Sequence, residues 1–349
     1  MTPTFQECSK SLKQRFHALD TLRGFAALAV VVYHLMPSFR GYLAVDFFLV
    51  LSGFVLSHVY LYGEKKVTFS TFLGKRFFRM YPLHLVTLMG VGVLFFIAPE
   101  SKGHADYGVM TFWQNVGLVQ CVGLPPHVLS WNVPSWSISA EFWINVLFIV
   151  FISRRTPTWL LLSVSTLIIA IINWQSSHLN VHTQNYWHAV NAGLLRCAAS
   201  FLLGIVAYRG HMCRPAAAWL GRWTSWGQGV LLLLAAAAIA VPENRLFFMD
   251  YAAPFVFAAL VYVMAHASGP AACLGKLRYV GLISYSIYLN QILVDKVLCL
   301  RFDDLRENQP WIYLGIFIPI LLVVSAGTYH LIEVPCNRGL RRVLTKKPA

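Results

Sequence analysis

Apolar residues run along this chain in long stretches, and short polar connections separate them. A stretch of roughly 20 mostly apolar residues is long enough to cross a bilayer as a helix. The pattern therefore predicts an all-α polytopic membrane protein with about ten transmembrane helices. The expected segments are residues 17–36, 43–62, 83–98, 137–152, 158–173, 190–208, 228–241, 252–266, 279–299 and 311–332.

Composition agrees with this pattern. Hydrophobic residues make up 57% of the 349 residues and charged residues 12%, and the mean hydropathy is +0.59. These values exclude an ordinary soluble globular protein. We expect the first segment to be a retained helix rather than a signal peptide. Its polar residues lie inside the apolar run, and no small-residue cleavage site follows it.

The positions of Lys and Arg predict the orientation, because cytoplasmic connections carry an excess of both. With the N-terminus inside, the cytoplasmic side collects Lys10, Lys13, Arg15, Lys65, Lys66, Lys75, Arg76, Arg79, Arg154, Arg155, Arg209, Arg214, Arg222, Lys276, Arg278 and the basic residues of 338–347. The other side has only Arg40, Lys102, Arg245, Lys296, Arg301 and Arg306. Both termini are therefore expected in the cytoplasm. The net charge of +14 is explained by this orientation signal and by attraction to anionic lipid, without nucleic acid.

The same reading divides the chain into three parts. Residues 1–16 form a cytoplasmic N-terminal tail, residues 17–335 a transmembrane domain, and residues 336–349 a basic cytoplasmic C-terminal tail. No CxxC motif and no Cys/His cluster with metal-ligand spacing occurs, so no metal site is expected. Of the seven cysteines, only Cys121 and Cys299 fall on the outer side, and a disulfide between them is one hypothesis.

Ionisable groups inside apolar segments mark candidate sites, because such groups are costly in a membrane unless they are paired or face a cavity. In the first segment Asp20, Arg23 and His34 share one helical stripe with the small or apolar Gly24, Ala27 and Val31. This stripe suits the wall of an internal passage. The alternative is that Arg23 extends to the membrane surface and His34 is a satisfied interfacial side chain.

Three further clusters repeat this pattern. Asp46 begins the second segment on the same side as His34, and it is either a partner of His34 or a helix N-cap. Arg76 and Arg79 project from one helical face on the cytoplasmic side, either as anchors or as phosphate ligands. Glu141 lies about a turn and a half inside the fourth segment, too deep for a cap, with a cation or His34 as its expected partner.

Polar groups also occur in later segments. The ninth segment contains ISYSIYLNQ over residues 283–291, with Ser284, Tyr285 and Tyr288, and the sixth contains Arg196. The chain ends its last segment with YHLIEVP.

These motifs stand in an order that resembles one known family. LRGFAALAVVVYH, VDFFLVLSGF, KRFFRMYP, SWSISAEFW, an Arg with FLLG, SYSIYL and a final IEVP resemble the acyltransferase-3 family over residues 16–335. Members of this family are integral-membrane acyltransferases with ten helices and both termini inside, and many O-acetylate bacterial surface polysaccharides. The resemblance implies an O-acyltransferase, most simply an O-acetyltransferase, in the bacterial cytoplasmic (inner) membrane.

The resemblance also implies roles for particular residues. His34 would be the general base for the acceptor hydroxyl or a transient acyl carrier, and Glu141, with Asp46 as a second candidate, would orient it. Arg23, Arg76 and Arg79 would bind the phosphates of cytoplasmic acetyl-CoA or another acyl-CoA. The passage would be lined by Ser284, Tyr285, Tyr288, Arg196 and Trp136, with Tyr285 donating to the developing oxyanion.

Spacing along the first segment is compatible with these roles. Arg23 and His34 are eleven residues apart, roughly 16 Å along a helix axis. An extended pantetheine arm covers such a distance. The expected acceptor is a carbohydrate: a polysaccharide, a lipid-linked oligosaccharide or a lipo-oligosaccharide.

Family members commonly carry a His where this chain has Gln291. We expect Gln291 to replace that His as a hydrogen-bonding group. Two alternatives to the enzyme remain from the sequence: a transporter or flippase without acyl chemistry, and an assembly subunit of an envelope complex. Acyl-CoA binding would distinguish the enzyme from a flippase, and an assembly subunit would leave His34 and Glu141 unexplained.

Overall fold

The computed structural model describes residues 16–63, 67–98, 106–126, 128, 130–187, 190–213, 223–242, 248–266 and 269–345. The expected N-terminal tail up to residue 15 and residues 346–349 of the C-terminal tail lie outside this part. So do several basic residues used to predict the orientation: Lys10, Lys13, Arg15, Lys65, Lys66, Lys102, Arg214, Arg222, Arg245, Lys346 and Lys347.

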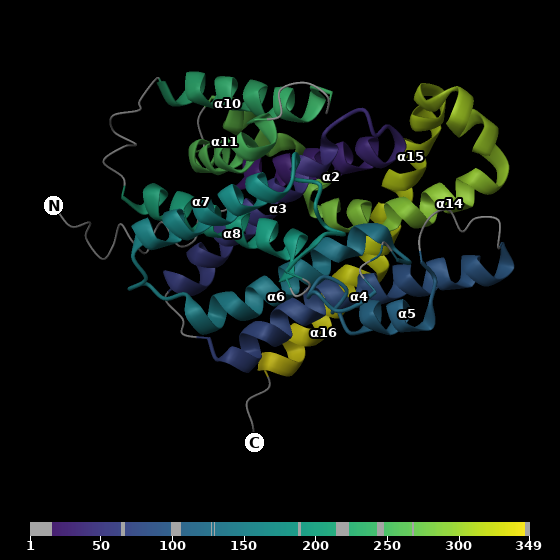
Figure 1. Cartoon of the computed structure of the whole chain (residues 1–349), viewed down its shortest axis with the longest axis horizontal. Coiled ribbons are helices and arrows are strands. Elements are labelled where there is room, and N and C mark those ends of the chain that lie inside the picture. Colours follow the sequence, from purple (N-terminus) through teal and green to yellow (C-terminus); the bar gives the residue numbers. More distant parts are fainter. Residues whose placement is uncertain are drawn as a thin grey trace.

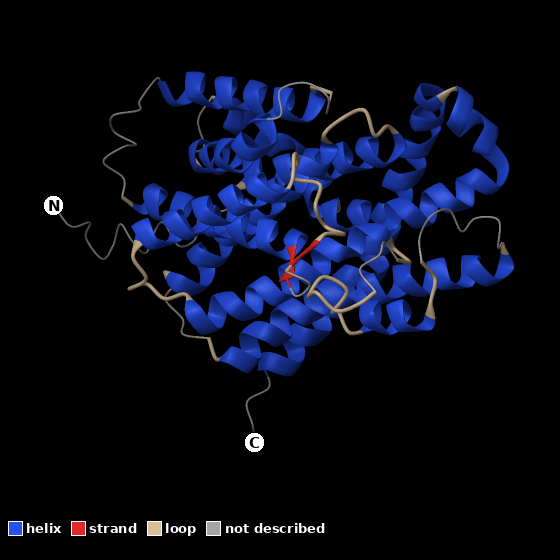
Figure 2. Ribbon diagram, viewed as in Figure 1, coloured by secondary structure: helices blue, strands red, loops and turns tan. Residues whose placement is uncertain are grey.

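Nearly every described element is a helix (Figure 2). The longer helices are α2 (His17–Leu35), α3 (Ala44–Leu56), α4 (Phe69–Ile97), α5 (Val109–Val116), α6 (Trp136–Phe151), α7 (Thr158–Gln175), α8 (Ala192–Met212), α10 (Trp223–Ala240), α11 (Phe248–Met264), α14 (Ser284–Asn308), α15 (Pro310–Thr328) and α16 (Val334–Thr345). Short helical turns are η1 (Gly41–Leu43), η2 (Ser57–Leu61), η4 (Val133–Ser135), α12 (Pro270–Leu274), η5 (Gly275–Leu277), α13 (Arg278–Leu282) and η6 (Tyr329–Glu333). One two-stranded antiparallel sheet joins β1 (Asn185–Tyr186) to β2 (Val190–Asn191).

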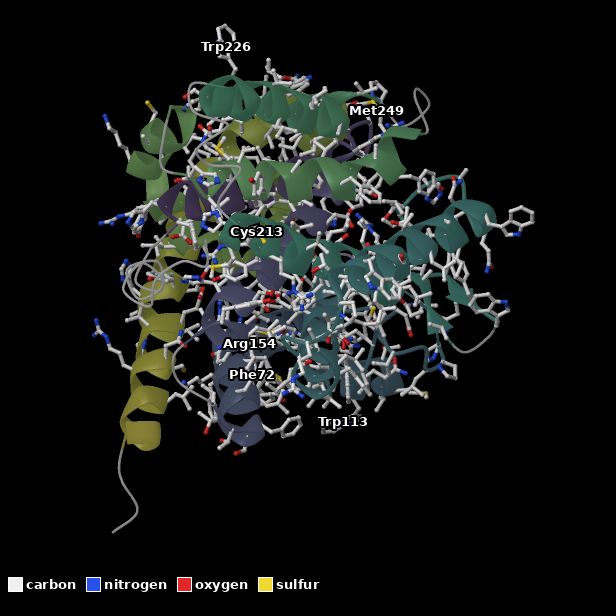
Figure 3. The ribbon with its side chains drawn as sticks, turned by 90° about the vertical axis from the view of Figure 1, so that its left-hand side faces the viewer. Phe72, Trp113, Arg154, Cys213, Trp226 and Met249 are labelled. Carbon is white, nitrogen blue, oxygen red and sulfur yellow. The ribbon has the colours of Figure 1, made fainter. Side chains whose placement is uncertain are left out.

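This architecture confirms the expected all-α class. Seven helical segments in the described part of the chain are long and apolar enough to cross a membrane, and two shorter apolar helices lie at 224–240 and 249–264. The count of ten and the cytoplasmic location of both termini stay predictions. Exposed Trp113 and Trp226 point away from the protein at opposite edges of the molecule (Figure 3).

One expectation about the start of a segment needs correction. The third segment was expected to begin after Pro82, but α4 passes through Pro82 and starts at Phe69. Proline is tolerated inside membrane helices because neighbouring groups satisfy the backbone that it leaves open. The C-terminal stretch forms α16 up to Thr345 and packs along α4, and the expected division into a transmembrane domain and a C-terminal tail stays a prediction.

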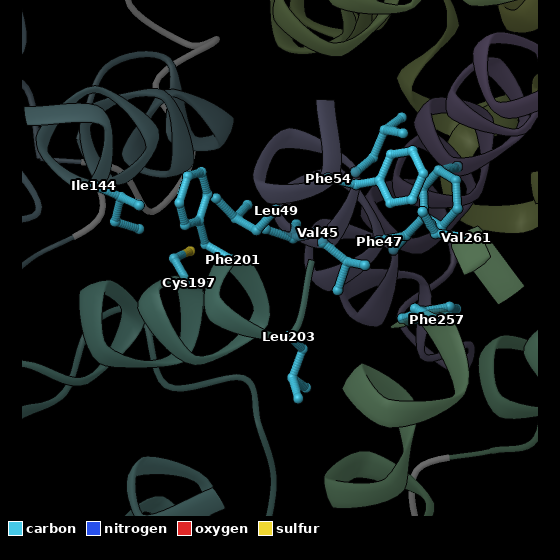
Figure 4. Close-up of a cluster of buried hydrophobic side chains, with 14 of the residues drawn as sticks. Val45, Phe47, Leu49, Phe54, Ile144, Cys197, Phe201, Leu203, Phe257 and Val261 are labelled. Carbon is cyan, nitrogen blue, oxygen red and sulfur yellow. The ribbon is translucent and has the colours of Figure 1, made fainter. Parts of the chain in front are cut away.

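The most extensive contact between two helices is that of α3 and α8, which lie side by side (Figure 1). A Cβ atom on Gly53 would lie 2.1 Å from the carbonyl oxygen of Phe201, and one on Gly204 would lie 2.0 Å from that of Val50. Only glycine therefore lets these two backbones touch. Around this contact Leu49 and Phe201 pack with further apolar side chains of α6 and α11 (Figure 4).

The helix α2 packs against α13 and α14. Ala27 and Val31, which were expected to leave room along a passage, are buried against Ile283 and Ile287. The stripe from Asp20 to His34 is therefore interrupted by solid packing in its middle. Any internal space must turn away from α2 at this level.

Candidate active site

A cavity of about 750 Å³ lies between α2, α3, α4, α6 and α14. Five charged side chains line it: Asp20, Arg23, Arg76, Arg79 and Glu141. Its remaining walls are mostly apolar and come from α2, α3 and α6. Cavities of this size, with a few convergent polar groups on apolar walls, are typical of sites for small molecules and cofactors.

The three arginines are brought together from two helices, and two of them are held in place. Arg23 donates to Ser284 Oγ at 2.8 Å and to the carbonyl oxygen of Gly281. The guanidinium of Arg76 lies over the rings of Tyr60 and Phe72, 5.8 and 6.0 Å from their centroids. Arg79 is exposed, one turn further along the same face of α4. This arrangement presents planar cationic groups at one end of the cavity, which we call the arginine end.

Glu141 faces the cavity from α6, as its depth in the sequence predicted. Its carboxylate accepts a hydrogen bond from Ser52 of α3 at 3.2 Å, and it lies within electrostatic range of Arg23 and Arg76. The hydrogen-bond partner of Glu141 is therefore Ser52 rather than His34. The expectation that Glu141 orients His34 has no support in these contacts.

On α14, Tyr288 is the last residue that lines the cavity. The Tyr288 hydroxyl lies 2.7 Å from Ser137 Oγ, and its ring contacts that of Phe48 at 5.8 Å between centroids. Tyr285, one turn away and also lining the cavity, donates to the carbonyl oxygen of Met80. Its hydroxyl is thus committed to a contact between α14 and α4, which argues against the expected role as an oxyanion donor.

His34 lies beyond this wall, near the C-terminal end of α2. Its Nδ1 is 3.0 Å from the carbonyl oxygen of Val30 and 3.0 Å from Gln291 Oε1. The amide of Gln291 is oriented by its Nε2, which donates to the carbonyl oxygen of Tyr288 at 2.8 Å. Both partners of Nδ1 are therefore acceptors, so the proton of neutral His34 resides on Nδ1 and Nε2 keeps its lone pair.

This geometry gives Gln291 the role that sequence reasoning assigned to Glu141. The sequence did indicate Gln291 as a hydrogen-bonding substitute, but it did not indicate His34 as its partner. Tyr288 and Gln291 are one helical turn apart on α14, so the end of the cavity and the residue that holds His34 lie on neighbouring turns.

Asp46 and Arg196 form a buried ion pair in the core. Arg196 donates to Asp46 at 2.6 Å and to the carbonyl oxygens of Leu179 and Tyr42, and Ser200 donates to the same carboxylate at 2.7 Å. Both side chains are 1% exposed. The structure therefore places Arg196 in the core rather than on a passage wall. Asp46 caps no helix end and has its hydrogen bonds on α8.

Trp136, the last expected lining residue, stacks on His182 at 5.0 Å between centroids and an angle of 16°. His182, Asn180 and Gln120 are polar residues near this end that sequence reasoning missed. They lie in connections rather than in apolar segments. Polar residues are ordinary in connections, so the sequence gives no reason to single these out.

The expected disulfide is absent. Cys121 and Cys299 are both free thiols. Cys121 is buried against Asn191, whereas Cys299 lies beside Tyr313 of α15. The two cysteines therefore belong to different parts of the bundle. Among the described residues, no group of three His, Cys, Asp or Glu side chains is arranged to hold a metal ion.

Comparison with known proteins assigns the chain to a family. A family profile described as "Acyltransferase domain" matches residues 16–330. The chain is 35% identical over 189 residues to Protein 2 in picA locus of Rhizobium radiobacter, which covers 47% of this chain and 97% of that protein. It is 34% identical over 148 residues to the acyltransferase MdmB of Streptomyces mycarofaciens, 37% of each chain.

A third relative aligns over most of the chain. Peptidoglycan O-acetyltransferase OatA of Listeria monocytogenes is 26% identical over 357 residues, 92% of this chain and 56% of that protein. The chain thus spans about half the length of OatA and less of MdmB. No solved structure matches the chain. The profile covers nearly all of the described bundle, and the protein therefore belongs to the acyltransferase-3 family of multi-pass membrane proteins.

Proposed function

We propose that this protein is a membrane-embedded O-acyltransferase. It moves an acyl group, most simply acetyl, from cytoplasmic acyl-CoA to a hydroxyl group of a cell-surface or lipid-linked carbohydrate. The observation that carries the proposal is the relation between cavity and histidine. Three arginines line the cavity, and Tyr288, the last residue of α14 that lines it, lies one helical turn from the residue that holds His34.

The arginine end fits the donor. Guanidinium groups bind phosphates with paired hydrogen bonds, and acyl-CoA carries several phosphates on a long, narrow arm. Arg23 and Arg76 are already held by neighbours, so little side-chain entropy is lost when they bind. The mostly apolar walls beyond them would take the pantetheine arm and its thioester.

The opposite end fits the acceptor chemistry. A hydroxyl group is a poor nucleophile, and His34 Nε2 has the lone pair that can take its proton. The acceptor oxygen attacks the thioester carbonyl, the C–S bond breaks, and the proton passes from His34 to the departing thiolate. Gln291 Oε1 stabilises the imidazolium that exists between these two transfers. If His34 carries the acyl group itself, the same lone pair attacks the thioester first.

Tyr288 stands between the two ends, held by Ser137 and packed on Phe48. For the thioester to meet His34, this side chain must turn or the arm must pass beside it. Such a wall keeps water from reaching the bound thioester before the acceptor arrives.

The proposed setting is the bacterial cytoplasmic membrane, with the arginine end facing the cytoplasm. The excess of Lys and Arg on that side supports this orientation. The name of OatA, a peptidoglycan O-acetyltransferase, supports a carbohydrate acceptor.

The test is mass spectrometry of envelope glycans from cells that express wild type, His34→Ala, His330→Ala or nothing. His330 is an exposed histidine on η6, so it is a matched control. We expect one added acyl mass with wild type and His330→Ala, and a decrease of at least about 100-fold with His34→Ala, as for loss of a general base.

Binding of labelled acetyl-CoA by the purified proteins separates the alternatives. If His34→Ala binds the donor and still acylates glycans at the wild-type rate, the proposed chemistry is wrong. If wild type binds no donor and adds no acyl group in a host whose glycans it should modify, the result favours the transporter hypothesis over the enzyme.

A further inference from the structure

A second, smaller cavity lies beside Trp136, at the end of the bundle that contains His34. Its volume is about 20 Å³, enough for one hydroxyl group or one water molecule. Polar side chains from three separate segments line it: Gln120, Ser135, His182 and Asn191. We call it the polar pocket.

One wall of the polar pocket is a connected hydrogen-bond network. Asn115 donates to Ser130 Oγ and accepts from Ser135 Oγ, both at 2.9 Å. The Nε2 of Gln120 lies 3.1 Å from the carbonyl oxygen of Ser135, to which it donates. These contacts orient the Gln120 amide and turn its Oε1 to the other side. That oxygen is buried and has no hydrogen-bond partner among the described residues.

The facing wall leaves a second acceptor open. Asn180 Nδ2 donates to the hydroxyl of Tyr33 at 2.8 Å, so Asn180 Oδ1 is the atom 3.2 Å from His182 Nδ1. A carbonyl oxygen only accepts, so Nδ1 carries the proton and His182 Nε2 has a lone pair. Nε2 is also buried without a partner in the described part of the chain.

His182 stays neutral in this place. It lies in the connection between α7 and α8, and its ring stacks on Trp136. Burial, and next the positive charge of Arg196, lower the pKa of His182 to about 3. At neutral pH the two open atoms, Gln120 Oε1 and His182 Nε2, are therefore both acceptors, and a matching ligand must donate hydrogen bonds.

The polar pocket is also connected to the proposed chemistry. Tyr33, which anchors Asn180, precedes His34 in the chain, and the rings of Tyr33 and His34 are 5.4 Å apart between centroids. One molecule could therefore place one hydroxyl group at His34 and a second hydroxyl group in the polar pocket. Carbohydrates suit this arrangement, because they present several hydroxyl donors on neighbouring carbon atoms and an apolar ring face that can lie on a tryptophan.

We propose that the polar pocket is a subsite for the carbohydrate acceptor, in which His182 Nε2 and Gln120 Oε1 share the single proton of one hydroxyl group, other than the reacting one, in a three-centre hydrogen bond. The proposal rests on the proposed function, because it names how the acceptor of that reaction is held. It assigns His182, Gln120 and Trp136 to acceptor binding and leaves donor binding to the arginine end.

The experiment uses the purified full chain in lipid nanodiscs and the glycan fraction extracted from the expressing cells. Glycan binding is measured directly, and acyl transfer is measured with labelled acetyl-CoA while glycan or donor is varied. The variants are His182→Asn, His182→Gln and Gln120→Leu. Asn places an amide N–H where Nδ1 was and removes the acceptor at the position of Nε2, whereas Gln places a polar atom there.

The matched control is Gln184→Leu. Gln184 is two residues from His182, and its amide oxygen already accepts from Ser176. We expect His182→Asn and Gln120→Leu to raise the KM for glycan by about 5- to 10-fold, the usual effect of one lost hydrogen bond. The KM for acetyl-CoA should not change, and His182→Gln and Gln184→Leu should stay closer to wild type.

Each other outcome decides a question. If wild type transfers acyl groups and the variants keep its glycan KM, the polar pocket holds only a structural water and the inference is wrong. If wild type binds glycan through these residues but transfers nothing, the inference stands and the proposed function fails. If wild type neither binds glycan nor transfers acyl groups, both are wrong.

Discussion

At the scale of single residues, the state of His34 follows from its neighbours on α2 and α14. Two acceptors share its Nδ1 proton, and one of them is fixed by a further hydrogen bond to the backbone at Tyr288. A histidine held in this way presents Nε2 as a base without first having to exchange tautomers. Gln291 is thus a positioning residue for His34.

We predict that Gln291→Leu lowers kcat for acyl transfer by about 10- to 100-fold, the order known for hydrogen-bond partners that orient metal-bound histidines, and leaves the KM for acetyl-CoA unchanged. Gln291→His should retain most activity, since its ring can also accept from Nδ1. Steady-state kinetics of both variants in nanodiscs would check this. Equal losses in the two variants would contradict the assigned role.

Sequence reasoning identified several residues of this site but not their partners. Arg23 and Glu141 were recognised because charges inside apolar segments are exceptional, and Arg76 and Arg79 because they share one helical face at the cytoplasmic side. The structure brings all four to one cavity. Whether Glu141 meets His34 or Ser52 depends on the rotation and depth of α6 relative to its neighbours, and no local pattern encodes that.

At the scale of elements, the contact between α3 and α8 fixes the site. Gly53 and Gly204 bring the two backbones together, and the pair of Asp46 and Arg196 closes the same interface with charges that are 1% exposed. Breaking a buried pair by removing one partner typically costs about 3–5 kcal/mol, because it leaves an uncompensated charge. The neighbouring face of α3 supplies Phe48 and Ser52 to the cavity.

We predict that Gly53→Ala or Gly204→Ala lowers the melting temperature of the protein or prevents its accumulation, because each added methyl group would meet a carbonyl oxygen at 2.0 to 2.1 Å, far inside van der Waals contact. Gly227→Ala on α10 is the control, since a Cβ atom there has no neighbour within 4 Å. Thermal unfolding in detergent would compare the three. A wild-type melting temperature for Gly53→Ala would show that α3 and α8 can separate without loss.

The lengths of the apolar segments predicted most helices well, because every helix that crosses a bilayer needs a long apolar segment. It failed where local chemistry was overruled by neighbours. Pro82 lies inside α4, and Ala27 and Val31 fill space against α14 that their small or branched side chains had been expected to leave open. In both cases packing between helices decided the outcome.

At the scale of the whole molecule, the arginine end and the end with His34 and the polar pocket define a direction through the bundle. An exposed charged residue lies at each end of this direction. Lys75 lies at the N-terminal part of α4 near the arginines, and Asp304 lies near the turn between α14 and α15. This separation allows the orientation to be tested without reference to activity.

We predict that, in a variant without native cysteines, Asp304→Cys reacts with a membrane-impermeant maleimide added to intact cells. Lys75→Cys should react only after the membrane is opened, because the arginine end faces the cytoplasm. Both positions are exposed, so both should react in detergent. The reverse pattern would place the arginine end outside and would exclude cytoplasmic acyl-CoA as the donor.

The separation of the two ends has a further consequence for energetics. The arginines would retain the charged phosphates at one end of the cavity. Only the neutral acyl group would move to the end with His34, where the proton of the acceptor hydroxyl is exchanged locally. No net charge then travels through the field across the membrane, where each elementary charge would exchange about 2.3 kcal/mol per 100 mV. Acyl transfer by this route is electrically silent, so a cell could continue to acylate its glycans at the same rate while its membrane potential changes.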